Sequence, residues 1–201
     1  MANFGIVILA AGNSSRMGQP KQLLDFGGQP LIRHAAQAAI DSRGHPVVVV
    51  CGQFEGEIRG ALHGLAVEIA PNPHWAGGMG TSIQAGLRAL APYRPDGVIL
   101  TLGDLPMLTS ATYNQLLDAH SSSAKPIVAS AYAGTVGVPV LFTKEYFEPL
   151  MALTPAQGCK GIILAHEGDA LRLPCPEAEA DVDTPVDYAR ALCALAGESA
   201  A

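Results

Sequence analysis

Residues 6–24 of the chain are IVILAAGNSSRMGQPKQLL. The apolar, branched residues at the start of this stretch are typical of a strand that other elements cover on both faces. The run continues directly into a loop bracketed by Gly12 and Gly18. Because neither glycine has a side chain, backbone N–H groups there can approach phosphate oxygens closely, while Arg16 offers a bidentate donor and Lys21 a mobile positive charge. The stretch therefore predicts a buried first strand followed by an anion-binding loop.

The composition predicts one globular domain with a negative surface. Of the 201 residues, 49% are hydrophobic and 15% are charged, which favours a substantial core over disorder. The formal net charge is −6. Non-specific binding to nucleic acid or to an anionic membrane needs a broad basic face, so we expect neither as a partner. Any phosphate site must therefore be locally cationic.

The cysteines and the N-terminal residues indicate the compartment. Cys51, Cys159, Cys175 and Cys193 are scattered without a C-x-x-C pair, which argues against a zinc knuckle and against a disulfide framework. We expect them to be reduced thiols. No positive residue precedes the short apolar run at 4–11, so it does not resemble a secretory signal, and no stretch is long enough to span a bilayer. The expected compartment is the cytoplasm.

Strands and helices are expected to alternate along the first half of the chain. Apolar runs at 47–51 and 98–102 have the same character as the first strand, and the helices expected between them span residues 30–40, 55–62 and 81–90. This alternation predicts a single Rossmann-like α/β domain with a mostly parallel, doubly wound sheet. Ligands of such sheets bind beyond the carboxyl ends of the strands.

The second half predicts further strands and helices that would make the sheet a mixed one. The expected elements are a helix from Thr109 to His120, a strand pair at 126–132 and 137–142, helices at 144–153 and 159–166, a short strand at 171–173 and a last helix from Pro185 to about Leu195. Residues 1–196 would form the domain, and 197–201 would be a frayed tail.

An aspartate follows the strand expected at 98–102, in a position that suits a metal ligand. Residues 103–106 are GDLP, so Asp104 stands at the carboxyl end of a buried strand, where the glycine permits close approach and the proline stops the strand. Mg²⁺ prefers one or two protein carboxylates together with phosphate oxygens and water. An aspartate that caps the following turn would give the same pattern.

Three further aspartates surround the start of the last helix, in the segment ADVDTPVDY at 180–188. The helix dipole favours carboxylates at such a position whatever their function. We expect Asp181 and Asp187 to be structural.

A glycine-rich segment precedes the helix expected at 81–90. Residues 72–87 are NPHWAGGMGTSIQAGL, and Gly77, Gly78 and Gly80 predict a pliable loop. Thr81 and Ser82 then supply hydroxyl and N–H groups for a ribose, a base or a phosphate. We expect Trp75 to be a packing residue rather than a platform on which a base stacks.

Together these motifs resemble one enzyme family. The first loop fits neither the P-loop pattern nor G-x-G-x-x-G, but L-A-A-G-x-S-x-R-M-G-x-x-K-x-L-L at 9–24 and G-D-x-P at 103–106 resemble the nucleotidyltransferases that include the molybdenum cofactor cytidylyltransferases and guanylyltransferases. The N-P-x-W-x-x-G-M-x-x-S-x-x-x-G-L pattern at 72–87 is similar to a segment that lines the nucleotide pocket of that family. The resemblance implies a fold of the nucleotide-diphospho-sugar transferase type.

The resemblance also implies the site residues. Asp104 and Asp183 would hold Mg²⁺, because residues 181–188 resemble the family's D-x-D-T-P-x-D-Y segment. The implied catalytic residues are Arg16, Lys21 and Asp104, and residues that face the acceptor would be Gly137 and Pro139, although an ordinary turn between strands needs the same residue types. The implied nucleotide-binding residues are Leu9, Ala10, Ala11, Gly12, Ser14, Ser15, Arg16, Lys21, Asn72, Gly78, Met79, Ser82 and Gly103.

The implied activity is Mg²⁺-dependent transfer of CMP from CTP to the phosphate of a molybdopterin-type cofactor, with release of pyrophosphate. R-M-G-Q-P-K, which has no acid directly before the lysine, is more similar to the cytidylyltransferase branch. Residues 157–164 depart from the family's G-D-x-G-A-R pattern, with Cys159 in place of the acid and Ile163 in place of the arginine. A guanylyltransferase, a sugar or alditol phosphate nucleotidyltransferase, and a non-catalytic chaperone that hands the cofactor to a molybdoenzyme client are the alternatives.

Overall fold

The computed structural model describes residues 2–12 and 19–198 and is built around one seven-stranded sheet. The strand order is β5-β4-β1-β6-β8-β7-β9. The strands are β1 (Phe4–Ala10), β4 (Val47–Cys51), β5 (Glu68–Pro71), β6 (Gly97–Leu102), β7 (Ile127–Tyr132), β8 (Thr135–Thr143) and β9 (Ala170–Pro174). β2 (Asp25–Phe26) and β3 (Gln29–Pro30) form a separate two-stranded hairpin.

The sheet is mostly parallel, as the sequence predicts. β1 pairs in parallel with β4 and β6, and β4 pairs in parallel with β5. β8 is antiparallel to both β6 and β7, so β7 runs in the same direction as β6. The carboxyl ends of β1, β6 and β7 therefore lie at one edge of the sheet, which makes this edge the place to look for a ligand site.

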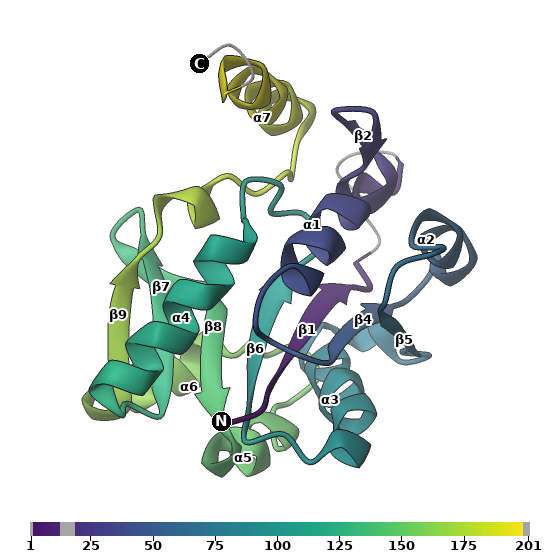
Figure 1. Ribbon diagram of the computed structural model, residues 1–201. Helices are drawn as coiled ribbons and strands as arrows, with labels where there is room; N and C mark the ends of the chain where they lie inside the picture. The colour runs from purple at the N-terminus through teal and green to yellow at the C-terminus, as the bar shows by residue number, and fades with distance from the viewer. Residues whose placement is uncertain (1, 13–18, 199–201) are drawn as a thin grey trace.

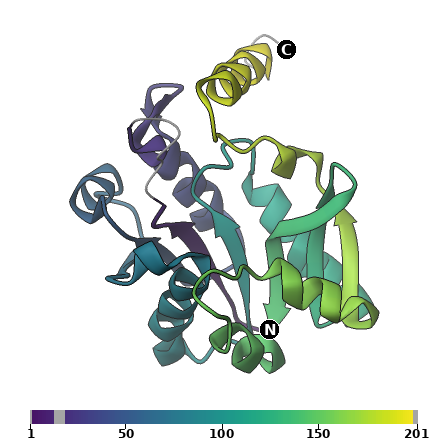
Figure 2. The same cartoon turned by 180° about the vertical axis from the view of Figure 1, so that it is seen from behind.

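Helices cover both faces of the sheet because both faces are apolar. All seven residues of β1 are buried; Val7 and Leu9 belong to the core on one face, and Ile6 and Ile8 to the core on the other. The first core is covered by α3 (Met79–Leu90), α5 (Phe147–Met151) and α6 (Lys160–Ala165) (Figure 2). The second core is covered by α1 (Leu31–Ile40), α2 (Glu55–Ala61) and α4 (Ser110–Ser123) (Figure 1).

The last helix, α7 (Pro185–Glu198), lies beyond the carboxyl ends of the strands, beside the β2–β3 hairpin (Figure 1). A third apolar cluster joins Ala191 on this helix to Phe26 on the hairpin and to Val182. At the start of α7, Thr184 donates to Asp187 Oδ2 from its N–H (2.9 Å) and its hydroxyl (2.7 Å), and these hydrogen bonds lower the pKa of Asp187. Asp187 thus caps the start of α7, the kind of structural role that the sequence predicts for it.

The structure differs from the sequence prediction at several elements. β5 and the short hairpin were not predicted. The helix expected at 144–153 is a 3₁₀ turn at Lys144–Tyr146 followed by α5, because Pro149 has no N–H to donate to the carbonyl four residues earlier. α7 extends past Leu195 to Glu198, so residues 197 and 198, which we expected in a frayed tail, are helical.

The described residues contain no membrane-spanning helix and no disulfide. No helix among them is both long enough and apolar enough to cross a bilayer. The four cysteines, all within the described ranges, are free thiols, as predicted.

A glycine on α3 permits close contact between this helix and the sheet. A Cβ added to Gly86 would lie 3.1 Å from Cγ2 of Val7 and 3.2 Å from Cγ2 of Val50, which are both fully buried on the paired strands β1 and β4. We therefore expect Gly86→Ala to lower the free energy of unfolding by about 1–3 kcal/mol through overpacking. Urea unfolding followed by circular dichroism measures this change.

The control for this substitution is Gly60→Ala on α2. A Cβ added there meets nothing within 4 Å, so alanine should leave the stability unchanged or raise it through its higher helix propensity. Equal stability of Gly86→Ala and the wild-type protein would contradict the packing argument.

Candidate active site

The site is assembled where β1 and β6 end. The N–H of Gly103 donates to the carbonyl of Leu9 (3.1 Å), so the turn after β6 is fixed beside the end of β1. A Cβ on Gly103 would lie 2.7 Å from Cδ1 of Ile32, so this glycine is needed for packing against α1. Asp104 follows directly, and the carboxylate predicted to hold a metal thus stands beside the strand that leads into the glycine-bracketed loop.

A backbone hydrogen bond brings the second aspartate to the first. The N–H of Val182 donates to the carbonyl of Asp104 (3.1 Å), and the Val182 side chain is fully buried in the cluster beneath α7. This anchor places Asp183 next to Asp104, although many residues separate the two in the sequence. The sequence shows the anchor only as an apolar residue between two acids.

Lys21 contacts both carboxylates. Its Nζ lies 2.6 Å from Oδ1 of Asp183 and forms an ion pair with Oδ2 of Asp104. The exposed fractions of the three side chains are 14% for Lys21, 11% for Asp104 and 31% for Asp183. Burial disfavours the charged form of Lys21, but the two carboxylates outweigh this effect and raise its pKa, so the lysine is a cation at neutral pH.

The Asp104 carboxylate has one oxygen without a partner. Among the described residues, Oδ1 of Asp104 is the buried side-chain oxygen or nitrogen atom that has no hydrogen-bond partner. Burial raises the pKa of Asp104, and the positive charge of Lys21 acts in the opposite direction. The pKa of Asp181 is also raised, first by partial burial and then by the charges of Asp183 and Asp104. This acidic group therefore favours a bound cation.

The donor set fits a hard divalent cation. Asp104 and Asp183 supply only oxygen ligands: one oxygen of each contacts Nζ of Lys21, and Oδ1 of Asp104 is buried without a partner among the described residues. Mg²⁺ and ions of similar chemistry prefer such ligands and need only one or two protein carboxylates when phosphate and water complete the shell. No group of three or more His, Cys, Asp or Glu residues that could hold a metal occurs in the described parts of the chain.

Part of the predicted phosphate loop can be described and part cannot. Ser14, Ser15 and Arg16, together with Gly18, lie outside the described residues. Gly12 is described, and its carbonyl accepts a hydrogen bond from Nε2 of Gln22 (3.3 Å), whose side chain the sequence analysis did not single out. Gln22 is only 3% exposed, so a buried amide ties the start of the loop to its end.

The predicted nucleotide-binding residues Asn72 and Ser82 contact each other. Nδ2 of Asn72 donates to Oγ1 of Thr81 (2.9 Å) and to Oγ of Ser82 (3.0 Å), and Oδ1 of Asn72 accepts from the N–H of His74 (3.0 Å). Asn72 and Ser82 are both buried. In this structure they connect the end of β5 to the first turn of α3, so any role toward a nucleotide includes holding this turn in place.

The glycines around residue 78 do not form a pliable loop, and this expectation is wrong. Residues Trp75–Gly77 are a 3₁₀ turn, α3 begins at Met79, and Gly78 has a φ of +121°. A Cβ on Gly78 would lie 2.6 Å from the carbonyl oxygen of Pro155, and the N–H of Gly80 donates to that carbonyl (2.9 Å). The glycines thus allow the segment at 154–157 to pack closely against the start of α3.

Trp75 packs against the core on the α3 face of the sheet, as predicted. Cγ of its ring would lie 2.8 Å from a Cβ on Gly52. The side chain is thus held against the backbone that follows β4.

The predicted acceptor residues lie on β8, beside β7. Val138–Pro139 is a cis peptide bond, and the Pro139 carbonyl accepts a hydrogen bond from the buried Ser130 hydroxyl (2.6 Å). A Cβ on Gly137 would lie 3.3 Å from Cζ of Tyr132, so the phenol covers this glycine. Burial, and next the charge of Asp181, raises the pKa of Tyr132. Sequence reasoning missed Tyr132, because only the pairing of β7 with β8 brings its ring, from the residue opposite Thr135, over Gly137.

The positions that depart from the resembled pattern are part of the core. Cys159 is 4% exposed and Ile163 is 1% exposed, and both pack against the face of the sheet that α3 covers. Burial raises the pKa of Cys159 to about 12, so it is a neutral thiol. Neither residue can take the place of the charged side chains expected at these positions.

Comparison with known proteins agrees with this architecture. The MobA-like NTP transferase domain matches residues 6–170. The bifunctional protein GlmU of Kineococcus radiotolerans is 35% identical over 126 residues, which are 61% of this chain and 26% of that protein. Nicotine blue oxidoreductase of Paenarthrobacter nicotinovorans is 33% identical over 115 residues, 57% of this chain and 55% of that protein. The chain thus spans about a quarter to a half of the length of these curated relatives.

A solved structure covers nearly the whole chain. Rv0371c of Mycobacterium tuberculosis superposes with a TM-score of 0.78 and 29% identity, over 95% of this chain and 98% of that one. A manganese complex of the same mycobacterial protein superposes with a TM-score of 0.72. Because the family match extends from β1 to the first residue of β9, the chain belongs to the MobA-like NTP transferase domain family, a family of nucleotidyltransferases.

Proposed function

We propose that the protein is a divalent-metal-dependent cytidylyltransferase that moves CMP from CTP to the phosphate of a molybdopterin-type cofactor. The observation that carries the nucleotidyl transfer is the meeting of Lys21 with Asp104 and Asp183 at the carboxyl edge of the sheet. Family membership supports the reaction class. The choice of CTP rests on R-M-G-Q-P-K at residues 16–21, and the choice of acceptor rests on the resemblance of the whole motif set.

In the proposed reaction, an oxygen of the acceptor phosphate attacks the α-phosphorus of the nucleotide in line. The bond from the α-phosphorus to the oxygen that bridges to the β-phosphate breaks, and pyrophosphate leaves with that oxygen. A phosphate monoester is already largely ionised at neutral pH, so the chain needs no general base. The protein contributes chiefly by positioning the two substrates and by offsetting their negative charge.

The side chains around Lys21 fit this task. Lys21, together with Arg16, would offset charge on the departing pyrophosphate. Asp104 and Asp183 would hold the metal, and the complex of manganese with Rv0371c supports a divalent ion in a relative. When bound there, the ion would neutralise phosphate charge and polarise the α-phosphate. Tyr132, Gly137 and Pro139, at the same edge of the sheet, would face the acceptor.

Pyrophosphate release tests the proposal. We expect release only when a divalent metal, CTP and molybdopterin-type cofactor are present together, and slower release when GTP or ATP replaces CTP. Equal or faster release with GTP would overturn the choice of base. Release with a sugar phosphate or an alditol phosphate, but not with the cofactor, would overturn the acceptor. Binding of the cofactor without any pyrophosphate release would indicate the chaperone alternative.

A thermal-shift panel ranks the nucleotides independently of the acceptor. A ligand that binds only the folded protein raises the apparent melting temperature by mass action. CTP with Mg²⁺ should therefore give a larger shift than GTP or ATP at the same concentration.

A further inference from the structure

The Lys21 ammonium lies where the two carboxylates of the site meet. Its Nζ contacts Oδ2 of Asp104 and lies 2.6 Å from Oδ1 of Asp183, and Oδ1 of Asp104 is buried without a partner among the described residues. The lysine therefore already neutralises part of the charge that would attract a metal ion. These three side chains alone carry a formal charge of −1, and when the lysine moves away the two carboxylates carry −2, the charge that a divalent ion neutralises.

A divalent ion and the ammonium cannot share these oxygens. Mg²⁺ binds carboxylate oxygens at about 2.0–2.1 Å, so an ion bound to the two oxygens that now contact Nζ, Oδ2 of Asp104 and Oδ1 of Asp183, would overlap the ammonium. Two cations in contact also repel each other strongly at a site so little exposed to water. Metal binding to these two oxygens therefore requires Lys21 to leave.

The local structure allows the Lys21 side chain to move away from the carboxylates while its backbone stays in place. Lys21 opens a short 3₁₀ turn, Lys21–Leu23, and the next residue, Gln22, is buried and bonded to the Gly12 carbonyl. The backbone of the turn is thus anchored. The lysine has a flexible stem of four carbons, so rotation about its side-chain bonds moves the charge while the turn stays in place.

We propose that Lys21 is an exchangeable internal cation of the metal site, which occupies the two carboxylates before the metal arrives and gives them up when it binds. This inference rests on the proposed function in one respect: the phosphates of the nucleotide are the new partner of the displaced ammonium. The metal alone then binds weakly, because it must displace Lys21 into water. Nucleotide and metal bind cooperatively, because each favours the same position of Lys21.

Metal binding in the absence of nucleotide tests the exchange. Free Mn²⁺ is measured by electron paramagnetic resonance in titrations of the wild-type protein, Lys21→Met and Lys21→Gln. Both variants remove the competing charge, and the glutamine keeps a neutral hydrogen-bond donor for the carboxylates. We expect each to bind Mn²⁺ about tenfold more tightly than the wild-type protein does, within the usual range of coupling between two sites.

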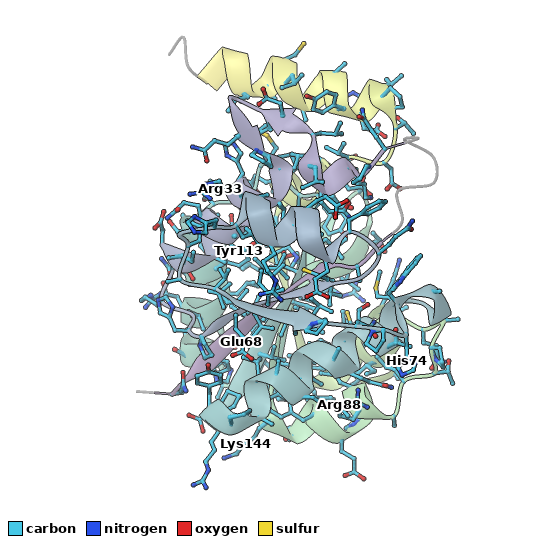
Figure 3. All side chains as sticks on the ribbon, turned by 90° about the vertical axis from the view of Figure 1, so that its right-hand side faces the viewer. Arg33, Glu68, His74, Arg88, Tyr113 and Lys144 are labelled. Atoms are coloured by element: carbon cyan, nitrogen blue, oxygen red, sulfur yellow. The ribbon has the colours of Figure 1, made fainter. Side chains whose placement is uncertain are left out.

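Two further variants identify the site and control for net charge. Lys144→Met makes the same change in net charge at a distant position. Lys144 pairs with Asp96 (3.7 Å) and lies at the opposite end of the molecule from α7 (Figure 3). This variant should bind Mn²⁺ like the wild-type protein. The double variant Lys21→Met, Asp104→Asn should lose the tight binding. Mn²⁺ affinity that is unchanged or weaker in both single Lys21 variants would overturn the proposal, as would tight binding that survives the loss of Asp104.

A measurement on the wild-type protein keeps the proposal testable if the variants fold poorly. The chain has four lysines, Lys21, Lys125, Lys144 and Lys160. Acetylation by an amine-specific reagent, read by peptide mass spectrometry, should become several-fold faster at Lys21 on addition of Mn²⁺ and stay constant at Lys144. An unchanged or slower rate at Lys21 would contradict the exchange. No nucleotide or acceptor is present in either experiment, so a wrong substrate assignment would leave both results unaffected.

Discussion

Replacing Lys21 with alanine should lower kcat/KM for nucleotidyl transfer by about 10²–10³-fold, the usual loss when one charge-stabilising group is removed from a transition state. Its ammonium lies at the carboxylates where the reacting phosphates would be bound. The variant should keep the fold but unfold at a lower denaturant concentration, because two adjacent carboxylates lose their shared cation. Pyrophosphate release measures the first effect, and urea unfolding measures the second.

Lys144→Ala is the matched control for this prediction. Its side chain is 71% exposed and pairs with Asp96. Lys144 lies at the opposite end of the molecule from α7 (Figure 3). We expect both turnover and stability to stay close to those of the wild-type protein, since exposed ion pairs contribute little. Near-normal turnover of a folded Lys21→Ala protein would refute the role of Lys21.

Replacing Asp104 with asparagine should lower turnover by at least about 10³-fold, at the upper end of the loss expected for one electrostatic group in an active site. The substitution removes the more deeply buried of the two carboxylates predicted to hold the metal. The free energy of unfolding should stay the same or increase, because asparagine carries no buried charge and Lys21 keeps Asp183 as its partner. Loss of function without loss of stability is the expected sign of a ligand-binding carboxylate.

Asp181→Asn is the control in the same acidic segment. Asp181 is exposed, and its interactions with Asp183 and Asp104 are those of like charges. Its replacement should change turnover far less than that of Asp104. If Asp104→Asn instead kept most of the turnover and lost much of its stability, Asp104 would be a structural residue that caps the turn after β6.

The strands of the fold could be predicted where burial leaves a clear pattern. β1, β4 and β6 are continuous branched apolar runs because helices cover both of their faces. β5 was not predicted, because it is an edge strand and only Ala70 among its four residues is buried, so it shows no continuous apolar run. The β2–β3 hairpin has two residues in each strand, too few for any periodicity.

The candidate site could be predicted in part. Asp104 stands out because it directly follows a buried strand, and the family resemblance paired it with Asp183. The backbone bond from Val182 to Asp104, which brings the two carboxylates together, joins segments far apart in the chain and leaves no local pattern. The same holds for the Tyr132 ring over Gly137 and for the bond from Gln22 to Gly12, since each depends on how separate segments pack.

The contact of Lys21 with the carboxylates is the feature that the sequence did not predict. The residue types indicated a lysine for phosphate and two acids for a metal, as separate tasks. In the structure the three groups form one cluster, because the 3₁₀ turn after the loop places Lys21 directly over the end of β6. Pairing a buried cation with buried acids offsets the free energy that it costs to remove each charge from water.

A crystal structure with Mn²⁺ and a non-hydrolysable CTP analogue tests the central claim most directly. The account predicts an anomalous manganese peak bound by carboxylate oxygens of Asp104 and Asp183, with Nζ of Lys21 on a phosphate oxygen. A manganese peak elsewhere, or nucleotide bound while Lys21 still lies between the two carboxylates, would contradict it.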